Sequence, residues 1–147
     1  MAKTIVITGA GRGIGWALAE QYAARGDRVV GTVRRAGTLP DGMTELVADV
    51  TDPAALAAAA AGLDTVDLLI CNAGLYLGRG AIGEPGFEPE AWRDVLMANV
   101  AGPFLTIEAF LPALRAAKGR IAIISSKMGS SEIAKGRSYI YRASKAA

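Results

Sequence analysis

The sequence predicts an α/β fold built around a parallel sheet. Short runs rich in β-branched residues alternate with longer segments of helical periodicity, and most strand candidates are separated by a helix candidate. The 147 residues, 52% of them hydrophobic, are enough for one domain with its own core. We find no internal repeat and no linker, so residues 1–147 are expected to form a single domain.

Five runs predict the strands, and the first helix lies between the first two. Residues 14–25 carry apolar side chains at helical spacing, and Gly26 stands where a glycine commonly ends a helix. Strand, helix and second strand thus form a βαβ unit. The predicted strands are KTIVIT (3–8), RVVGTV (28–33), TELVAD (44–49), VDLLIC (66–71) and GRIAIIS (119–125).

The segment DPAALAAAAAG predicts the second helix. Asp52 is placed as its N-cap, Pro53 suits the first helical position, and Gly62 stands past its end. The alanine run between them reflects helix propensity alone.

The next segment is a loop followed by two helices. Residues 75–90 are rich in Gly and Pro and break all periodicity, so the next helix is expected to start near Pro89. A further helix is predicted from about Ala101 to Lys118, with Gly119 past its end. Pro112 inside this helix should kink or shorten it. A last helix begins near Tyr139.

Composition excludes several classes of function. The formal charge is only +2 and no basic block is present, so nucleic-acid binding is not expected. The chain has no histidine and a single cysteine, Cys71, which excludes an internal disulfide, histidine catalysis and the usual zinc sites. We expect Cys71 to be an ordinary buried thiol and no metal to be bound. The sequence shows neither a signal peptide nor a run of about 18 apolar residues, which predicts a cytoplasmic protein without a membrane span.

The glycine-rich stretch TGAGRGIG, residues 8–15, predicts a dinucleotide site. It follows the first strand and opens the first helix, where glycines allow tight turns and let a pyrophosphate reach exposed N–H groups. The spacing is T-G-x-x-x-G-x-G, with Gly9, Gly13 and Gly15; Ile14 stands where G-x-G-x-x-G needs its third glycine. The alternative is a glycine-rich turn without a ligand.

The end of the second strand favours NADP(H) over NAD(H) as cofactor. NAD enzymes of this architecture tend to place an acid there, whereas this chain has Val33 followed by Arg34 and Arg35. Guanidinium groups bind a 2′-phosphate through charge-assisted hydrogen bonds, and Arg12 could add a third positive charge. Alternatively, Arg34 and Arg35 are solvated loop residues.

Six motifs stand in one order along the chain: TGAGRGIG, ADV at 48–50, NAG at 72–74, Asn99 in MANVAG, IISS at 123–126 and YRASK at 141–145. Together they resemble the short-chain dehydrogenase/reductase family, in particular its NADP-preferring, carbonyl-reductase-like members. The resemblance implies a Rossmann-type, doubly wound parallel sheet of strand order 3-2-1-4-5 and a nicotinamide cofactor. It also implies that Ile14, Asp49, Val50, Asn72, Ala73 and Gly74 help to bind that cofactor.

The same resemblance implies a catalytic tetrad of Asn99, Ser126, Tyr141 and Lys145. Hydride transfer to a ketone leaves an alkoxide, so an acid must deliver a proton, and a nearby ammonium helps a phenol in that task by favouring the phenolate. Tyr141 and Lys145 are four residues apart and share a helix face, so Lys145 can reach both the surroundings of the phenol and the cofactor ribose. Both residues are therefore also expected to bind the cofactor.

Three of these assignments leave alternatives open. Tyr139 has Ala143 four residues on instead of a lysine, so Tyr141 is the catalytic choice over Tyr139. Ser126 would orient the substrate oxygen, with Ser125 as competitor, because strand alternation lets only one of them face the cleft. Asn99 would hold a water in a proton relay, or serve as a buried amide at a helix irregularity, or do both.

We therefore expect an NADP(H)-dependent oxidoreductase acting on a small carbonyl or alcohol substrate. The rivals are a dinucleotide sensor on the same fold and an inactive fragment. Members of the resembled family usually continue for roughly another hundred residues, so the chain is expected to be a piece that lacks the last strands. The apolar fifth strand would then have an open edge. The resemblance also implies a homo-oligomer, a dimer or tetramer, in the complete protein.

Overall fold

The computed structural model describes residues 1–133 and 135–147. Five strands form one sheet in the order β3-β2-β1-β4-β5, as predicted, and every neighbouring pair is parallel. The strands are β1 (Thr4–Thr8), β2 (Arg28–Val33), β3 (Thr44–Val47), β4 (Leu68–Cys71) and β5 (Arg120–Ile123).

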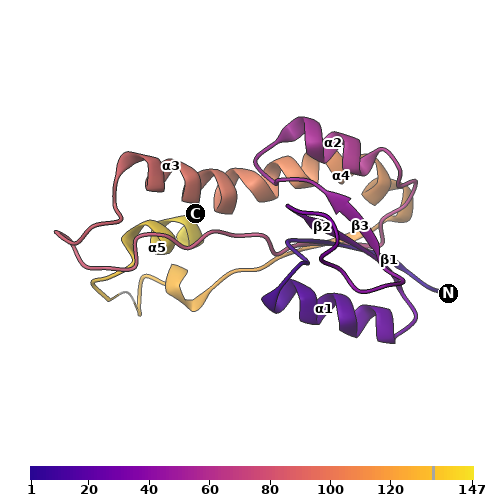
Figure 1. Ribbon diagram of the computed structural model, residues 1–147, viewed down its shortest axis with the longest axis horizontal. Helices are drawn as coiled ribbons and strands as arrows, with labels where there is room; N and C mark the ends of the chain where they lie inside the picture. The colour runs from indigo at the N-terminus through magenta and orange to yellow at the C-terminus, as the bar shows by residue number, and fades with distance from the viewer. Residues whose placement is uncertain (134) are drawn as a thin grey trace.

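Helices cover both faces of the sheet, with α1 (Gly13–Ala24) on one side and α2 (Pro53–Ala60) and α4 (Gly102–Ala117) on the other (Figure 1). Strand alternation sorts the core in two: one cluster joins Ile5, Ile7 and Ile70 to α1, and the other joins Val6, Val30 and Leu69 to Phe110 of α4. The doubly wound architecture is therefore confirmed.

Local signals placed α1 and α2 correctly. Gly26 after α1 has a φ of 83°, which suits glycine. The side chain of Asp52 accepts hydrogen bonds from the N–H groups of Ala54 and Ala55, so the predicted N-cap of α2 is confirmed. Cys71 is 4% exposed, and burial raises the pKa of its thiol to about 11, as expected of a buried, unreactive cysteine.

One long helix corrects the prediction of two. α3 (Pro89–Leu96), a π-helical turn η1 (Met97–Ala101) and α4 run without interruption. Pro112 does not shorten α4, which continues to Ala117. Pro112 and Glu108 both lie on the exposed side, so water can satisfy the Glu108 carbonyl that Pro112 leaves without a donor.

The long helix ends where predicted, with Gly119 past its end. Lys118 takes the left-handed conformation, with φ of 51°, instead of Gly119. Gly119 is needed for space, because a Cβ there would overlap the backbone oxygen of Val66. The rod of 29 residues is also long and apolar enough, by length and composition, to cross a membrane, which the sequence analysis did not anticipate. Its buried side chains Phe110, Ala113 and Leu114 belong to the core of the sheet.

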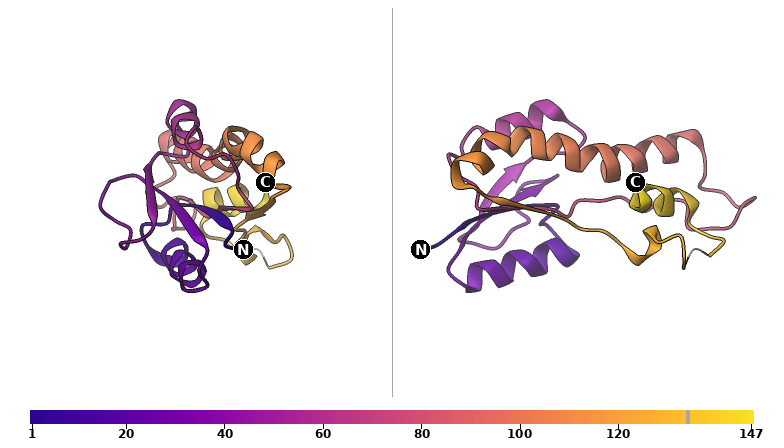
Figure 2. Two further views of the ribbon diagram at one scale, coloured as in Figure 1. Left: turned by 90° about the vertical axis from the view of Figure 1, so that its right-hand side faces the viewer. Right: turned by 180° about the vertical axis from the view of Figure 1, so that it is seen from behind.

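The molecule is elongated, and its second end is built from segments far apart in sequence (Figures 1 and 2). The loop after β4, the 3₁₀ turn η2 (Lys127–Gly129) and helix α5 (Tyr139–Ala146) lie there beside α3. Val95 of α3 and Ile140 of α5 are fully buried. β5 is an edge strand among the described residues, and its Ile121 and Ile123 are 44% and 56% exposed.

Candidate active site

The glycine loop meets the steric demands of a phosphate-binding turn. Gly9 has a φ of 67°, and a Cβ there would lie 3.0 Å from the Cα of Ala73. A Cβ on Gly15 would overlap the Gly9 carbonyl oxygen, so Gly15 allows α1 to pack against β1. Gly13 has a φ of 59° and open space around it. No side chain caps α1 at Arg12, so its first N–H groups remain available to an anion, as a pyrophosphate requires.

Thr8 holds this loop to the neighbouring strand. Its hydroxyl oxygen accepts hydrogen bonds from the N–H groups of Asn72 and Ala73, both at 3.1 Å. The Asn72 amide in turn donates to the carbonyl oxygens of Thr8 and Gly9 at 3.0 and 3.2 Å. Asn72 and Ala73, predicted to line the cofactor, therefore also fix the loop that would receive it. The sequence analysis missed Thr8.

Arg34 and Arg35 lie exposed at the carboxyl end of β2. Neither forms an ion pair with a described residue, so both guanidinium groups are open to a ligand. The loop after them is folded around Glu45, whose carboxylate accepts hydrogen bonds from the N–H groups of Gly37, Thr38 and Leu39 at 2.7 to 3.0 Å. These donors hold the pKa of Glu45 below its ordinary value. Sequence reasoning missed Glu45, since nothing local marks its partners.

Asp49 and Val50 follow β3 at the same edge of the sheet. The Asp49 carboxylate accepts hydrogen bonds from the Thr51 N–H and hydroxyl at 2.9 and 2.8 Å, which lower its pKa, and Arg34 adds a smaller contribution. Val50 is buried, and a Cβ on Gly102 would lie 2.9 Å from its side chain. Val50 therefore packs against the first turn of α4.

Asn99 is the buried amide at a helix irregularity that the sequence analysis weighed. It lies in the π turn and is 8% exposed. Its Oδ1 accepts from the Leu75 N–H at 2.7 Å, and its Nδ2 donates to the Leu75 carbonyl and the Ser144 hydroxyl, both at 2.9 Å. The Ser144 hydroxyl donates to the Tyr141 carbonyl at 2.8 Å. Asn99 thus connects the loop after β4 to the helix that carries Tyr141.

Tyr141 and Lys145 lie on one face of α5. The Lys145 ammonium is 5.7 Å from the centroid of the Tyr141 ring and donates to the Ile124 carbonyl at 2.9 Å, which ties α5 to the end of β5. Burial lowers the pKa of Lys145. Tyr139 packs edge-on against Phe87, with centroids 5.8 Å apart. The cation thus accompanies Tyr141 and not Tyr139.

Ser125 and Ser126 lie beyond the end of β5 and have different surroundings. Ser126 caps η2 by accepting from the Met128 N–H at 3.1 Å, so its own hydroxyl proton is free to be donated. Ser125 is exposed and lines a cavity of about 310 Å³ together with Asn99, Ser144 and Lys145. Contact between η2 and α5 is close, since a Cβ on Gly129 would overlap the backbone carbonyl of Lys145. Both serines are therefore near α5.

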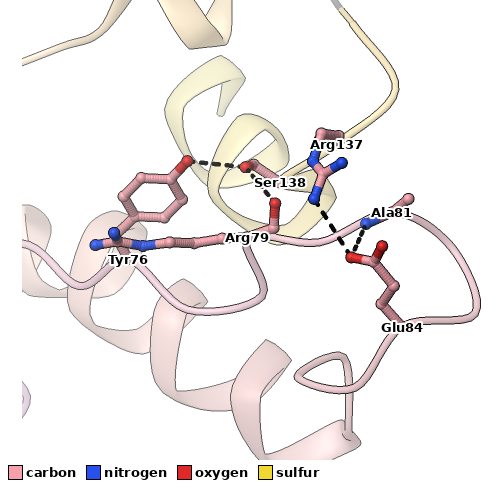
Figure 3. Close-up of polar contacts among 6 residues, drawn as sticks. All are labelled: Tyr76, Arg79, Ala81, Glu84, Arg137 and Ser138. Atoms are coloured by element: carbon pink, nitrogen blue, oxygen red, sulfur yellow. Dashed lines mark hydrogen bonds and ion pairs between the residues drawn. The ribbon is translucent and has the colours of Figure 1, made fainter.

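A second aromatic ring covers Tyr141, and sequence reasoning missed it. Tyr76, from the loop after β4, stacks on Tyr141 with centroids 4.3 Å apart and an interplanar angle of 29°. Its hydroxyl lies 2.8 Å from the Ser138 hydroxyl, as Figure 3 shows. An aromatic residue in a loop otherwise rich in glycine was the one available signal.

A glycine loop lies at the carboxyl end of β1, and a tyrosine–lysine pair is tied to the end of β5, the edge at which parallel α/β sheets bind ligands. The chain belongs to the short-chain dehydrogenase family, since the model of that family, described as short chain dehydrogenase, matches residues 3–147. Gly74 of the family motif lies against Asn99, whose Oδ1 would be 3.2 Å from a Cβ at that position.

Curated proteins with similar sequences include a dehydrogenase and a reductase. Serine 3-dehydrogenase of Rhizobium radiobacter is 35% identical over 137 residues, which cover 86% of this chain and 54% of the relative. The 3-oxoacyl-[acyl-carrier-protein] reductase FabG of Escherichia coli K12 is 33% identical over 140 residues, 87% of this chain and 56% of that protein. The chain therefore spans about half the length of these relatives.

Solved structures match the fold over nearly the whole chain. A short-chain dehydrogenase from Streptomyces avermitilis is 34% identical with a TM-score of 0.87, covering 99% of this chain and 56% of that one. A short-chain dehydrogenase from Burkholderia cenocepacia J2315, solved in complex with NADP, is 31% identical with a TM-score of 0.86, over 99% of this chain and 61% of that one. The fold of this chain therefore matches that of solved short-chain dehydrogenases over nearly its whole length.

Proposed function

We propose that this chain carries the cofactor site and the proton-transfer residues of an NADP(H)-dependent reductase that interconverts a carbonyl and an alcohol. The observation that carries the proposal is the Lys145 ammonium, 5.7 Å from the Tyr141 ring and anchored at the end of β5. A solvated helix-surface pair has no need of that anchor. A bound nicotinamide would supply or accept the hydride.

The side chains of α5 and its surroundings would handle the proton. In the reductive direction Tyr141 donates its phenolic proton to the oxygen that gains negative charge, and the Lys145 ammonium stabilises the phenolate left behind. Ser126, whose hydroxyl proton is free, orients the same oxygen. Asn99 fixes the backbone of α5 through Ser144 and is the proposed site of a relay water.

Arg34 and Arg35 support the choice of NADP(H). Their exposed guanidinium groups form no ion pair in the described part of the chain, and no carboxylate occupies the end of β2. Arg12, exposed in the glycine loop just before α1, is proposed to add a third positive charge. The relative from Burkholderia cenocepacia solved with NADP points the same way.

Calorimetric titration of the 147-residue protein with NADPH and, separately, NADH at equal ionic strength tests the cofactor proposal. We expect the wild type to bind NADPH more tightly than NADH. Arg34→Gln and Arg35→Gln should each weaken NADPH binding by about tenfold or more, because each variant removes one charged partner of the 2′-phosphate. Arg28→Gln is the matched control, because Arg28 is an exposed arginine at the opposite end of β2. Equal affinity for the two cofactors would contradict the NADP(H) assignment.

Turnover is measured separately, with NADPH and a panel of ketones. Turnover excludes both a sensor without chemistry and an inactive fragment. Tight binding of NADPH without turnover would favour those two functions over the one proposed here.

A further inference from the structure

Arg79 lies one ring away from the proposed proton donor. Its guanidinium carbon is 4.5 Å from the centroid of the Tyr76 ring, and that ring stacks on Tyr141. Figure 3 shows the Arg79 side chain running beside Tyr76 and away from Glu84 and Arg137. A cation therefore lies over the ring that stacks on Tyr141.

The backbone that carries Arg79 is held by one buried serine. The Ser138 hydroxyl donates to the Arg79 carbonyl at 3.3 Å, and it therefore accepts the proton of the Tyr76 hydroxyl 2.8 Å away. The Ser138 N–H donates to the Gly80 carbonyl at 3.1 Å. Ser138 is 4% exposed. Both the main chain of Arg79 and the ring on which it lies are thus fixed before any ligand binds.

The hydrogen-bonding edge of Arg79 remains free. Stacking on a ring uses the flat face of a guanidinium and leaves its five in-plane N–H donors available. In the described part of the chain, no carboxylate forms an ion pair with Arg79. The nearby carboxylate of Glu84 is committed instead to Arg137, at 3.4 Å, and to the Ala81 N–H, at 2.9 Å. Glu84 therefore pairs with Arg137, and the guanidinium of Arg79 is left for a ligand.

We propose that Arg79 is a specificity residue that binds the carboxylate of the substrate. The substrate class is therefore oxo acids and their hydroxy acids. This inference rests on the proposed function, since it assumes that the substrate oxygen meets Tyr141. A planar guanidinium matches a carboxylate with two parallel hydrogen bonds. A phosphate is the weaker fit, because it carries more charge and the other cation at this site, Lys145, already donates to Ile124.

Ligand binding without turnover tests the proposal on the 147-residue protein. The probes are 3-oxobutanoate and 4-oxopentanoate, each compared with its methyl ester, and NMR shifts of the arginine Nε–H signals report occupancy. We expect at least one acid to bind more tightly than its ester. Arg79→Gln should weaken that acid about tenfold or more and leave the ester unchanged.

Two further arms keep this result separable from the proposed function. Arg137→Gln is the matched control: a neighbouring arginine whose charge is already paired, so its loss should not affect the preference for the acid. Equal binding of acid and ester to the wild type, or an equal loss in both arginine variants, would overturn the proposal. Inorganic phosphate binding at Arg79 more tightly than either acid would overturn the carboxylate assignment. Loss of NADPH binding, measured separately, concerns the proposed function alone.

Discussion

At the scale of single residues, buried polar atoms organise the site. Thr8, Asn99 and Ser138 are each less than 9% exposed, and each bonds to backbone groups of a segment distant in sequence. Inside a protein such groups favour one arrangement of the chain, because a buried polar group without a hydrogen-bond partner lowers the free energy of unfolding. Two of the three, Thr8 and Ser138, could not be assigned from sequence, since their partners lie about sixty residues away.

Tyr141→Phe should remove the proton donor without disturbing the cofactor site. We expect turnover to fall by about 100- to 10,000-fold, the usual contribution of a positioned acid or base. NADPH affinity measured by calorimetry should stay the same. Tyr139→Phe is the control, because Tyr139 packs against Phe87 on the other side of α5. A Tyr141→Phe protein with normal turnover would remove this residue from the mechanism.

Thr8→Val tests the anchor of the glycine loop. Valine keeps the shape and removes the acceptor, so the N–H groups of Asn72 and Ala73 lose their partner. We expect the free energy of unfolding in urea to fall by about 1–3 kcal/mol. Thr8→Ser retains the hydroxyl and should lose less. Equal losses in the two variants would show that the methyl group matters more than the hydrogen bonds.

At the scale of elements, the strands and the helix caps follow from local sequence. Each strand is a short β-branched or apolar run. Asp52 begins α2 because its side chain accepts hydrogen bonds from backbone N–H groups, and Gly26 ends α1 because glycine adopts a positive φ easily. The long helix was misjudged because its continuity depends on tertiary contacts. Asn99 stabilises a π turn by bonding to Leu75, a partner that no local pattern reveals. The same holds for Tyr76, which reaches Tyr141 only when the chain is folded.

The stability of the loop that carries Arg34 and Arg35 should depend on pH, because the Glu45 carboxylate holds this loop. The pKa of Glu45 lies below the ordinary value of 4.5, because three backbone N–H groups bond to the carboxylate. The ionised carboxylate therefore contributes stability above a pH of about 4.5, and this contribution disappears as the pH falls through the lower folded-state value.

Urea unfolding of wild type and Glu45→Gln across this pH range measures that effect. The difference in stability between the two proteins should be largest near neutral pH and should vanish in acid. Glu20→Gln, an exposed acid on α1, should show no such trend. A difference that stays constant with pH would mean that ionisation of Glu45 is not the cause.

At the scale of the whole molecule, one row of apolar side chains remains uncovered. Leu96, Val100 and Phe104 follow one another along the long helix and are 38%, 39% and 67% exposed. We propose that this row pairs with a second copy of the chain, as part of the homo-oligomer that the family resemblance implies for the complete protein.

Phe104→Glu tests this assignment. The variant should shift the protein to a monomer in sedimentation velocity without loss of stability, since Phe104 is largely exposed. Ala116→Glu, exposed on the same helix outside this row, is the control. A wild type that is monomeric at high concentration would contradict the proposal for this chain.

The π turn at Asn99 also sets the rotation of α3 relative to α4 about their common helix axis. Its bond from the Gly102 N–H to the Met97 carbonyl spans five residues instead of four, so it inserts one residue into an otherwise regular rod. One residue corresponds to about 100° of helical rotation. The turn therefore changes the rotational phase between two parts of one helix: upstream of it α3, with its buried Val95, packs against α5, and downstream Phe110 packs in the core of the sheet. Deleting a single residue there would keep the helix continuous but rotate one part by about 100° relative to the other, so that either α3 or α4 would present a different face to its neighbour.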